Sequence, residues 1–142
     1  MIQALQKRLD IPSIFADEEL PRELVKMSGG CIRDVMHLTQ EALLVSEQRV
    51  KRWAFERAVQ TVRSQFSREI GTHQYPLLAR VFLNKTVAND AEHRQLLFRR
   101  DVLEYNYTEE RWADVHPLVR GIREFRNALE EEKRKLGLHA PS

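Results

Sequence analysis

The sequence predicts a mainly α-helical protein that contains one β-hairpin. Apolar residues recur three and four positions apart over much of the chain, which is the spacing of one buried helical face. The stretch 102–116 departs from this pattern, because two short segments rich in β-branched and aromatic residues flank a turn. At 142 residues, the chain is long enough for one ordinary domain or two very small ones.

The first third of the chain is expected to form short helices and one longer helix. Ile2, Leu5 and Leu9 indicate a first helix, which ends at Pro12 before a second helix opens at Asp17. The clearest helical pattern runs over 31–45, after the turn at 28–30. Its expected buried face comprises Ile32, Val35, Met36, Thr39, Ala42 and Leu43.

A long helix over about 50–68 and several shorter elements are expected next. The inward positions of the long helix are Trp53, Ala54, Ala58, Val62 and Phe66. Shorter helices are predicted over 75–83 and over 91–100, the second capped at Asn89-Asp90. Together with Phe55, Tyr105 and Trp112, the aromatic residues Trp53 and Phe66 are expected to be core residues.

The predicted hairpin pairs Val102–Tyr107 with Arg111–His116 across a turn at 108–110. A last helix is expected from Pro117 to about Gly137, with an apolar stripe of Leu118, Ile122, Phe125 and Leu129. Helices followed by a hairpin are the order of a winged-helix module. We therefore expect a winged-helix-like domain with a C-terminal helix over 49–142, and a separate small helical unit over 1–48.

Composition excludes several classes of protein. The chain has 23 Lys and Arg against 21 Asp and Glu, so any binding of nucleic acid has to come from a local patch. Its single Cys cannot form an internal disulfide, which fits a reducing compartment, and the cytoplasm is expected. Neither a membrane-spanning run nor the pattern of a signal peptide is present, so no membrane partner is expected.

One short motif carries candidate chemistry. Gly29 and Gly30 allow the backbone to turn sharply into a helix after Ser28, and Arg33 lies in the first turn of that helix. Arg33 is roughly 100° from Ile32 around the helix axis and lies outside the apolar stripe. Its guanidinium is therefore free to bind a phosphate through a planar fork.

Asp34 complements the helix dipole and could orient that guanidinium. The residues alone also allow a simpler interpretation, in which Ser28 caps the helix, Asp34 complements its dipole and Arg33 is a solvated charge.

The segment Leu24–Leu38 resembles the helical lid of AAA+ ATPases, in the branch that includes origin-recognition and signalling ATPases. In that lid, Ser-Gly-Gly, two variable residues and Arg-Asp precede an apolar helix. The second half is similar to the C-terminal winged-helix region of certain prokaryotic ATP-binding proteins. There a Leu-Glu-Tyr strand accompanies Trp-x-x-Val-His-Pro-Leu-Val, as Leu103–Tyr105 and Trp112–Val119 do here. The resemblance implies that Arg33 is a second sensor, which reports the γ-phosphate of ATP.

The phosphate-binding loop of an ATPase is absent from this sequence. No Gly-x-x-x-x-Gly-Lys-Ser/Thr occurs, so we expect no ATP hydrolysis and no cofactor bound by this chain alone. The resemblance implies that ATP and Mg²⁺ belong to the complete protein. Its nucleotide-binding core would precede Met1 in the natural polypeptide or come from another chain.

The predicted helix before the hairpin carries a candidate nucleic-acid surface. Its basic and amide side chains are Arg94, Gln95, Arg99 and Arg100, and Arg111 adds a charge near the hairpin tip. The acidic residues Glu92, Asp101, Glu109 and Glu110 dilute this charge, which favours docking to a protein or to the ATPase core over docking to duplex DNA. The alternative function is a stand-alone winged-helix DNA-binding or adaptor protein without a nucleotide link.

The histidines and the cysteine predict no further site. His37, His73, His93, His116 and His139 do not occur at metal-ligand spacing, and Cys31 has no second Cys, so no metal is expected. Cys31 is interpreted as a small buried hydrophobe rather than a nucleophile. No triad or dyad of an enzyme is visible.

Overall fold

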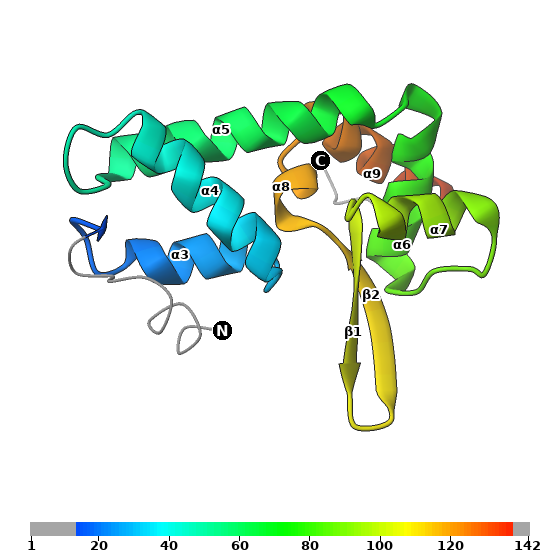
Figure 1. Ribbon diagram of the computed structural model, residues 1–142. Coiled ribbons are helices and arrows are strands. Elements are labelled where there is room, and N and C mark those ends of the chain that lie inside the picture. The colour runs from blue at the N-terminus through cyan, green and yellow to red at the C-terminus, as the bar shows by residue number, and fades with distance from the viewer. Residues whose placement is uncertain (1–13, 138–142) are drawn as a thin grey trace. The chain divides into compact units, whose positions relative to one another are not determined.

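The computed structural model describes residues 14–137 and is shown in Figure 1. Within this range the protein is mainly helical and has one sheet, of two antiparallel strands. The chain divides into two compact units, Met1–Gln65 and Phe66–Ser142. This boundary lies inside the long helix α5 (Arg52–Glu69), later in the chain than the boundary predicted after residue 48. The helix predicted around Ile2, Leu5 and Leu9 lies outside the described residues.

The first unit contains α3 (Leu20–Met27), α4 (Ile32–Leu44) and most of α5. An isolated parallel bridge between Phe15 and Val50 joins the segments that lead into α3 and α5. Arg52 adds an ion pair to Glu23, at 2.8 Å between Nη1 and Oε2. The hydrophobic core of this unit is formed by Phe15, Leu20, Leu24, Val35, Leu38, Ala42, Val50, Ala54, Phe55, Ala58, Val59 and Val62.

Two expected core positions in this unit are wrong. Leu43 is 41% exposed and Trp53 is 52% exposed. Each is one residue from a buried alanine, Ala42 and Ala54, and a step of one residue turns a side chain by roughly 100° around the helix. Both also lie in the terminal turn of their helix, next to the loop between α4 and α5.

The second unit begins with the end of α5, which the 3₁₀ turn η1 (Thr72–Gln74), α6 (Tyr75–Asn84) and α7 (Ala91–Phe98) follow. The hairpin of β1 (Val102–Tyr107) and β2 (Glu110–Val115) follows. The chain ends in α8 (Pro117–Arg120) and α9 (Arg123–Lys135). Helix α6 packs against both α9 and β2, and α7 contacts β1, so α6 forms the centre of the unit. Its apolar core includes Leu77, Leu78, Val81, Leu96, Val102, Val115, Leu118, Val119, Ile122 and Phe125.

The hairpin has the predicted strands but a tighter turn. Tyr107 pairs with Glu110, so only Thr108 and Glu109 form the loop. Tyr105 pairs with Trp112, and their rings stack with centroids 5.6 Å apart. Trp112 is nevertheless 39% exposed, so its expected place in the core is wrong. Tyr105 is half-buried, and its ring stacking with Trp112 stabilises the hairpin.

Two predicted helices are shorter than expected. α7 ends at Phe98, because Arg100 adopts a left-handed conformation with φ of 64° that no α-helix accepts. The last helix is divided into α8 and α9, because Ile122 has an extended ψ of 133° after Gly121. No helix within residues 14–137 combines the length and the apolar character needed to cross a membrane.

Candidate functional site

The turn between α3 and α4 is tightly built around Ser28. The Ser28 side chain is buried, and its Oγ donates a hydrogen bond to the carbonyl oxygen of Val25 at 2.6 Å. The same Oγ accepts a bond from the backbone N–H of Gly30 at 3.2 Å. Gly29 and Gly30 have φ of 66° and 86°, so the sharp turn predicted at these glycines is confirmed.

Ser28 therefore ends α3 instead of capping α4, so this one part of the simpler sequence interpretation is wrong, whereas Asp34 in the first turn and the exposed Arg33 agree with it. Cys31 is the N-cap of α4, and its side chain makes no capping bond. The first turn of α4 carries one acidic residue, Asp34, whose charge complements the positive end of the helix dipole.

Arg33 and Asp34 point to different sides of α4. Arg33 is exposed and makes no hydrogen bond or ion pair with any residue in 14–137. Asp34 is only 1% exposed, on the buried side of the helix. The expectation that the Asp34 carboxylate orients the Arg33 guanidinium is therefore wrong, because neighbouring helical residues diverge by roughly 100°.

A second candidate site is a cleft of about 510 Å³ in the unit that carries the hairpin. Its walls are the segment 86–89, α7 and the hairpin. Arg94 of α7 and Arg111 of β2, two of the predicted basic residues, line the same cleft, together with Glu104 of β1. Nη1 of Arg94 donates to Oδ1 of Asn89 at 3.0 Å, and Nε of Arg111 donates to Oδ1 of Asn106 at 3.1 Å.

The other residues of the predicted nucleic-acid surface do not line this cleft. Gln95 is exposed on α7 but does not line it. Arg100 is half-buried in its left-handed conformation. Arg99 is half-buried as well, and its guanidinium bonds to Asp101, to the carbonyl oxygen of Glu69 and to Oε1 of Gln74. Arg99 therefore supports the fold, which the acidic residue two positions later could have indicated.

Asp101 is the buried partner in that network. Its Oδ2 lies 2.8 Å from Nη2 of Arg99, whereas its buried Oδ1 has no hydrogen-bond partner within the described residues. Burial raises the pKa of the Asp101 carboxyl, and the Arg99 guanidinium opposes this rise. The network holds the segment between α7 and β1 in place.

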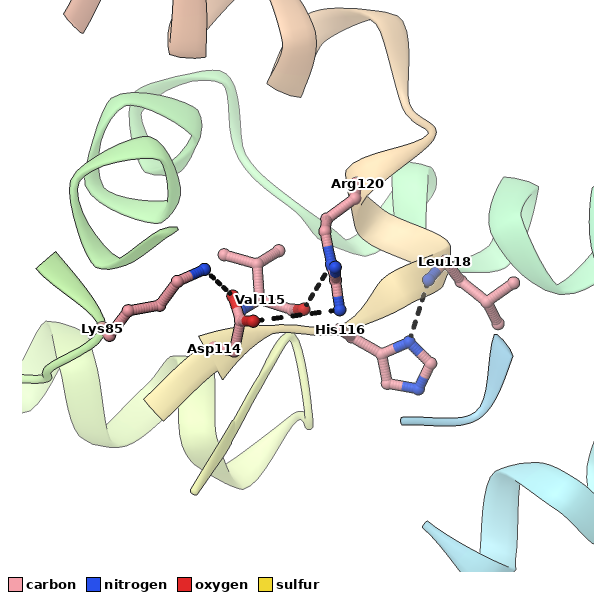
Figure 2. A network of polar contacts seen from close by, with 6 residues as sticks. All are labelled: Lys85, Asp114, Val115, His116, Leu118 and Arg120. Atoms are coloured by element: carbon pink, nitrogen blue, oxygen red, sulfur yellow. Dashed lines mark hydrogen bonds and ion pairs between the residues drawn. The ribbon is translucent and has the colours of Figure 1, made fainter. Parts of the chain in front are cut away.

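Polar contacts in the second unit hold the segment Trp112–Val119 against neighbouring elements, and Figure 2 shows them. Asp114 accepts a bond from Nζ of Lys85 at 2.9 Å, and Nη2 of Arg120 lies 4.0 Å from its other oxygen. Nδ1 of the buried His116 accepts a bond from the N–H of Leu118 at 3.1 Å and so caps α8. These residues join β2 to α6 and α8. Sequence reasoning missed Lys85, for which no signal existed.

The remaining polar residues form no further cluster of ligands. Among the described residues, no group of three His, Cys, Asp or Glu side chains could hold a metal ion. Cys31 is half-buried, and His37 pairs with Glu41 at 3.6 Å. His139 lies outside the described residues. Searches with this chain found no matching family model, curated protein or solved structure.

Proposed function

We propose that this chain is the lid and the winged-helix-like part of a cytoplasmic AAA+ type ATPase. In this function Arg33 senses the γ-phosphate of ATP, and the unit with the hairpin docks onto a protein partner or DNA. The observation that carries the proposal is the exposed Arg33 in the first turn of α4, which has no polar partner within residues 14–137 and follows a hydrogen-bonded turn. The resemblance of Leu24–Leu38 to AAA+ lids supports the same role.

The geometry of this turn suits an anion. No residue in the described part of the chain uses the five N–H donors of the Arg33 guanidinium, and a planar fork of donors matches a phosphate. The start of α4 adds the positive end of a helix dipole. Because Ser28 and its hydrogen bonds fix the turn, a contact at Arg33 would be passed to α3 and α4 together.

ATP and Mg²⁺ enter this proposal through another part of the assembly. The chain has no phosphate-binding loop, so the nucleotide-binding core lies elsewhere in the natural polypeptide or in another chain. A core in either position would present the γ-phosphate to Arg33. The chain itself would be a sensor and a docking element and not the site of hydrolysis.

The test begins with the native polypeptide, whose size and bound partners are measured after purification from the source cells with an antibody against this chain. The proposal expects an ATPase core in the same polypeptide or in a copurifying one. In that assembly, Arg33→Ala should lower ATP hydrolysis or the ATP-dependent response at least about tenfold, as expected for an arginine that contacts the γ-phosphate.

Arg22→Ala is the matched control, because Arg22 is an exposed arginine of α3 without a polar side-chain partner in 14–137. It should leave the response unchanged. Equal activity of the Arg33→Ala and Arg22→Ala assemblies would exclude the sensor role. So would a native preparation that contains no ATPase core.

A second candidate is a stand-alone winged-helix DNA-binding or adaptor protein. It is favoured by the exposed side chains of Arg94, Gln95 and Arg111 on α7 and β2. A salt titration of binding to a labelled duplex tests the DNA-binding form, because phosphate contacts release counterions and make affinity fall with salt. No affinity for duplex DNA at low salt would exclude that form.

A further inference from the structure

The edge of β2 that faces away from β1 has outward-pointing backbone groups at Arg111. The N–H of Ala113 donates to the carbonyl oxygen of Lys85 at 2.7 Å, on the side of β2 that faces away from β1. Backbone groups of alternate residues in a strand point to the same side. The N–H and C=O of Arg111 therefore point outward as well, because the two-residue turn makes Arg111 and Asn106 a pair that is not hydrogen-bonded.

No residue in 14–137 pairs with this outward edge at Arg111. The segment after Lys85 is bonded to β2 at Ala113, and residues 86–89 then line the cleft described above together with Arg111. The cleft thus opens beside an unpaired strand edge. Such an edge can accept an extended chain through backbone hydrogen bonds.

The charges that line the cleft favour an acidic occupant. Arg94 and Arg111 come from two different walls, and each guanidinium uses one N–H for an asparagine. The side chain of Arg111 is 72% exposed, and Glu104 lies 3.9 Å from its Nε. Two arginines against one glutamate leave the lining net positive, with guanidinium donors available to carboxylates.

We propose that this cleft binds an extended acidic peptide segment of a partner protein. The segment adds a strand beside Arg111 of β2 and places carboxylates against Arg94 and Arg111. The inference rests on the docking role proposed for the unit with the hairpin and not on the sensing role of Arg33. It names the chemistry of the partner that this unit recognises.

The same features make duplex DNA a poorer fit. Glu104 lines the cleft, Glu109 and Glu110 lie at the tip of the hairpin, and Glu92 is exposed on α7. A continuous row of phosphates would meet these carboxylates, whereas a short peptide can place its few charges only at the arginines. The unpaired strand edge also gives no advantage to a nucleic acid, since it offers backbone pairing to a polypeptide.

The experiment measures the fluorescence anisotropy of a labelled peptide of alternating Glu and Val with the full chain. Arg94→Gln and Arg111→Gln should each weaken binding about tenfold. Arg126→Gln is the matched control, because Arg126 is an exposed arginine of α9 that does not line the cleft, and it should bind as the unchanged chain does. Circular dichroism of each variant establishes that the exposed substitutions keep the fold.

Two further probes separate backbone pairing from charge. A peptide of the same sequence whose backbone amides are N-methylated should bind much more weakly, because methylation removes every N–H that could pair with β2, in either strand direction. A Lys-Val peptide should not bind. Equal binding of the N-methylated peptide, or equal binding by the Arg94→Gln and Arg111→Gln chains, would overturn the proposal.

Further outcomes distinguish peptide binding by the cleft from DNA binding and from nucleotide sensing by Arg33. No binding of the Glu-Val peptide would overturn it, as would tighter binding of a labelled duplex that Arg94→Gln and Arg111→Gln weaken. The Arg33→Ala chain should bind the peptide as the unchanged chain does. Failure of peptide binding thus leaves the nucleotide test of Arg33 unaffected, and failure of that test leaves the cleft unaffected.

Discussion

The Nζ atom of Lys85 lies 2.9 Å from Oδ1 of Asp114 and joins the end of α6 to β2 (Figure 2). The Lys85 backbone makes a second link, because its carbonyl oxygen accepts the N–H of Ala113 at 2.7 Å. Its Nζ also lies 3.9 Å above the centre of the Phe82 ring. A residue with a left-handed φ of 59° thus uses both its backbone and its side chain to hold the hairpin against the helix.

A double-mutant cycle should detect the link between Lys85 and Asp114. Lys85→Met and Asp114→Asn should each lower the free energy of unfolding by about 1 kcal/mol, since the pair is only partly exposed and Lys85 also contacts Phe82. The double variant should lose less than the sum, by about 0.5 kcal/mol, because the ion pair can be lost only once. Urea denaturation measures all four proteins, and strictly additive losses would contradict the link.

Helical spacing predicted most elements, because a helix that buries one face repeats its apolar residues three and four positions apart. This repeat is visible in the sequence even when the packing partner of the helix is unknown. The expected helix over 31–45 corresponds to Ile32–Leu44, and the expected helix over 50–68 corresponds to Arg52–Glu69. The strands of the hairpin were predicted from a different signal, the β-branched and aromatic residues on both sides of a turn. Errors fall at the ends of elements, where single backbone angles decide, as at Arg100 and Ile122.

The candidate sites were predicted in part. Positive φ at Gly29 and Gly30 follows from residue type, whereas the left-handed conformation of Lys85 and Arg100 is set by tertiary contacts that the sequence does not display. The sequence placed Arg94, Arg99 and Arg111 in one basic group. The structure separates them, because the guanidinium of Arg99 satisfies groups at the end of α5 and around Gln74.

The ionisation of Asp101 should make stability depend on pH. Burial raises the pKa of its carboxyl in the folded protein, so the folded state binds a proton more readily than the unfolded state. Between the ordinary value of about 4 and the raised pKa, stability therefore falls as the pH increases, and the loss persists above that range.

Asp101→Asn removes this ionisation and keeps the shape of the side chain. The difference in free energy of unfolding between the unchanged chain and the variant should shift in favour of the variant as the pH rises from about 4 to about 7. Urea denaturation across this range measures it, and the other carboxyls cancel in the difference. A constant difference, or one that favours the unchanged chain at higher pH, would contradict the assignment.

Asp90 should give the opposite dependence on pH. Its carboxylate caps α7 by accepting the N–H of His93 at 2.9 Å, and this bond, together with the His93 side chain, lowers the pKa of Asp90. The stabilisation is then complete above the ordinary pKa of about 4 and is lost as the pH falls through the lowered value. Asp90→Ala should melt at a lower temperature than the unchanged chain at neutral pH, and this gap should close in acid.

Asp90→Asn is the control for the cap, because an amide oxygen accepts the same bond without ionising. This variant should stay close to the unchanged chain at neutral pH and should not lose its cap in acid. The gap between Asp90→Ala and Asp90→Asn should therefore be nearly independent of pH. A difference in melting temperature between the unchanged chain and Asp90→Ala that widens in acid would contradict capping by the Asp90 carboxylate.

Thr108 is the strained residue of the hairpin turn. It has φ of 53° in a two-residue loop, a conformation that costs a residue with a Cβ roughly 1–2 kcal/mol and that glycine adopts readily. Thr108→Gly should therefore raise the free energy of unfolding by about 0.5–1 kcal/mol, because the relief of strain exceeds the greater flexibility of glycine in the unfolded chain. The bond from Oγ1 of Thr108 to the Tyr107 carbonyl oxygen is exposed, so its loss subtracts little.

Glu109→Gly provides the comparison within the same turn. Among the described residues other than glycine, left-handed φ occurs only at Lys85, Arg100 and Thr108, so Glu109 carries no such strain. Glycine at 109 should lower stability by about 0.5–1 kcal/mol through the entropy of the unfolded chain alone. Thermal and urea denaturation of both variants should thus give changes of opposite sign. If both substitutions lower the free energy of unfolding, the predicted relief of backbone strain at Thr108 is wrong.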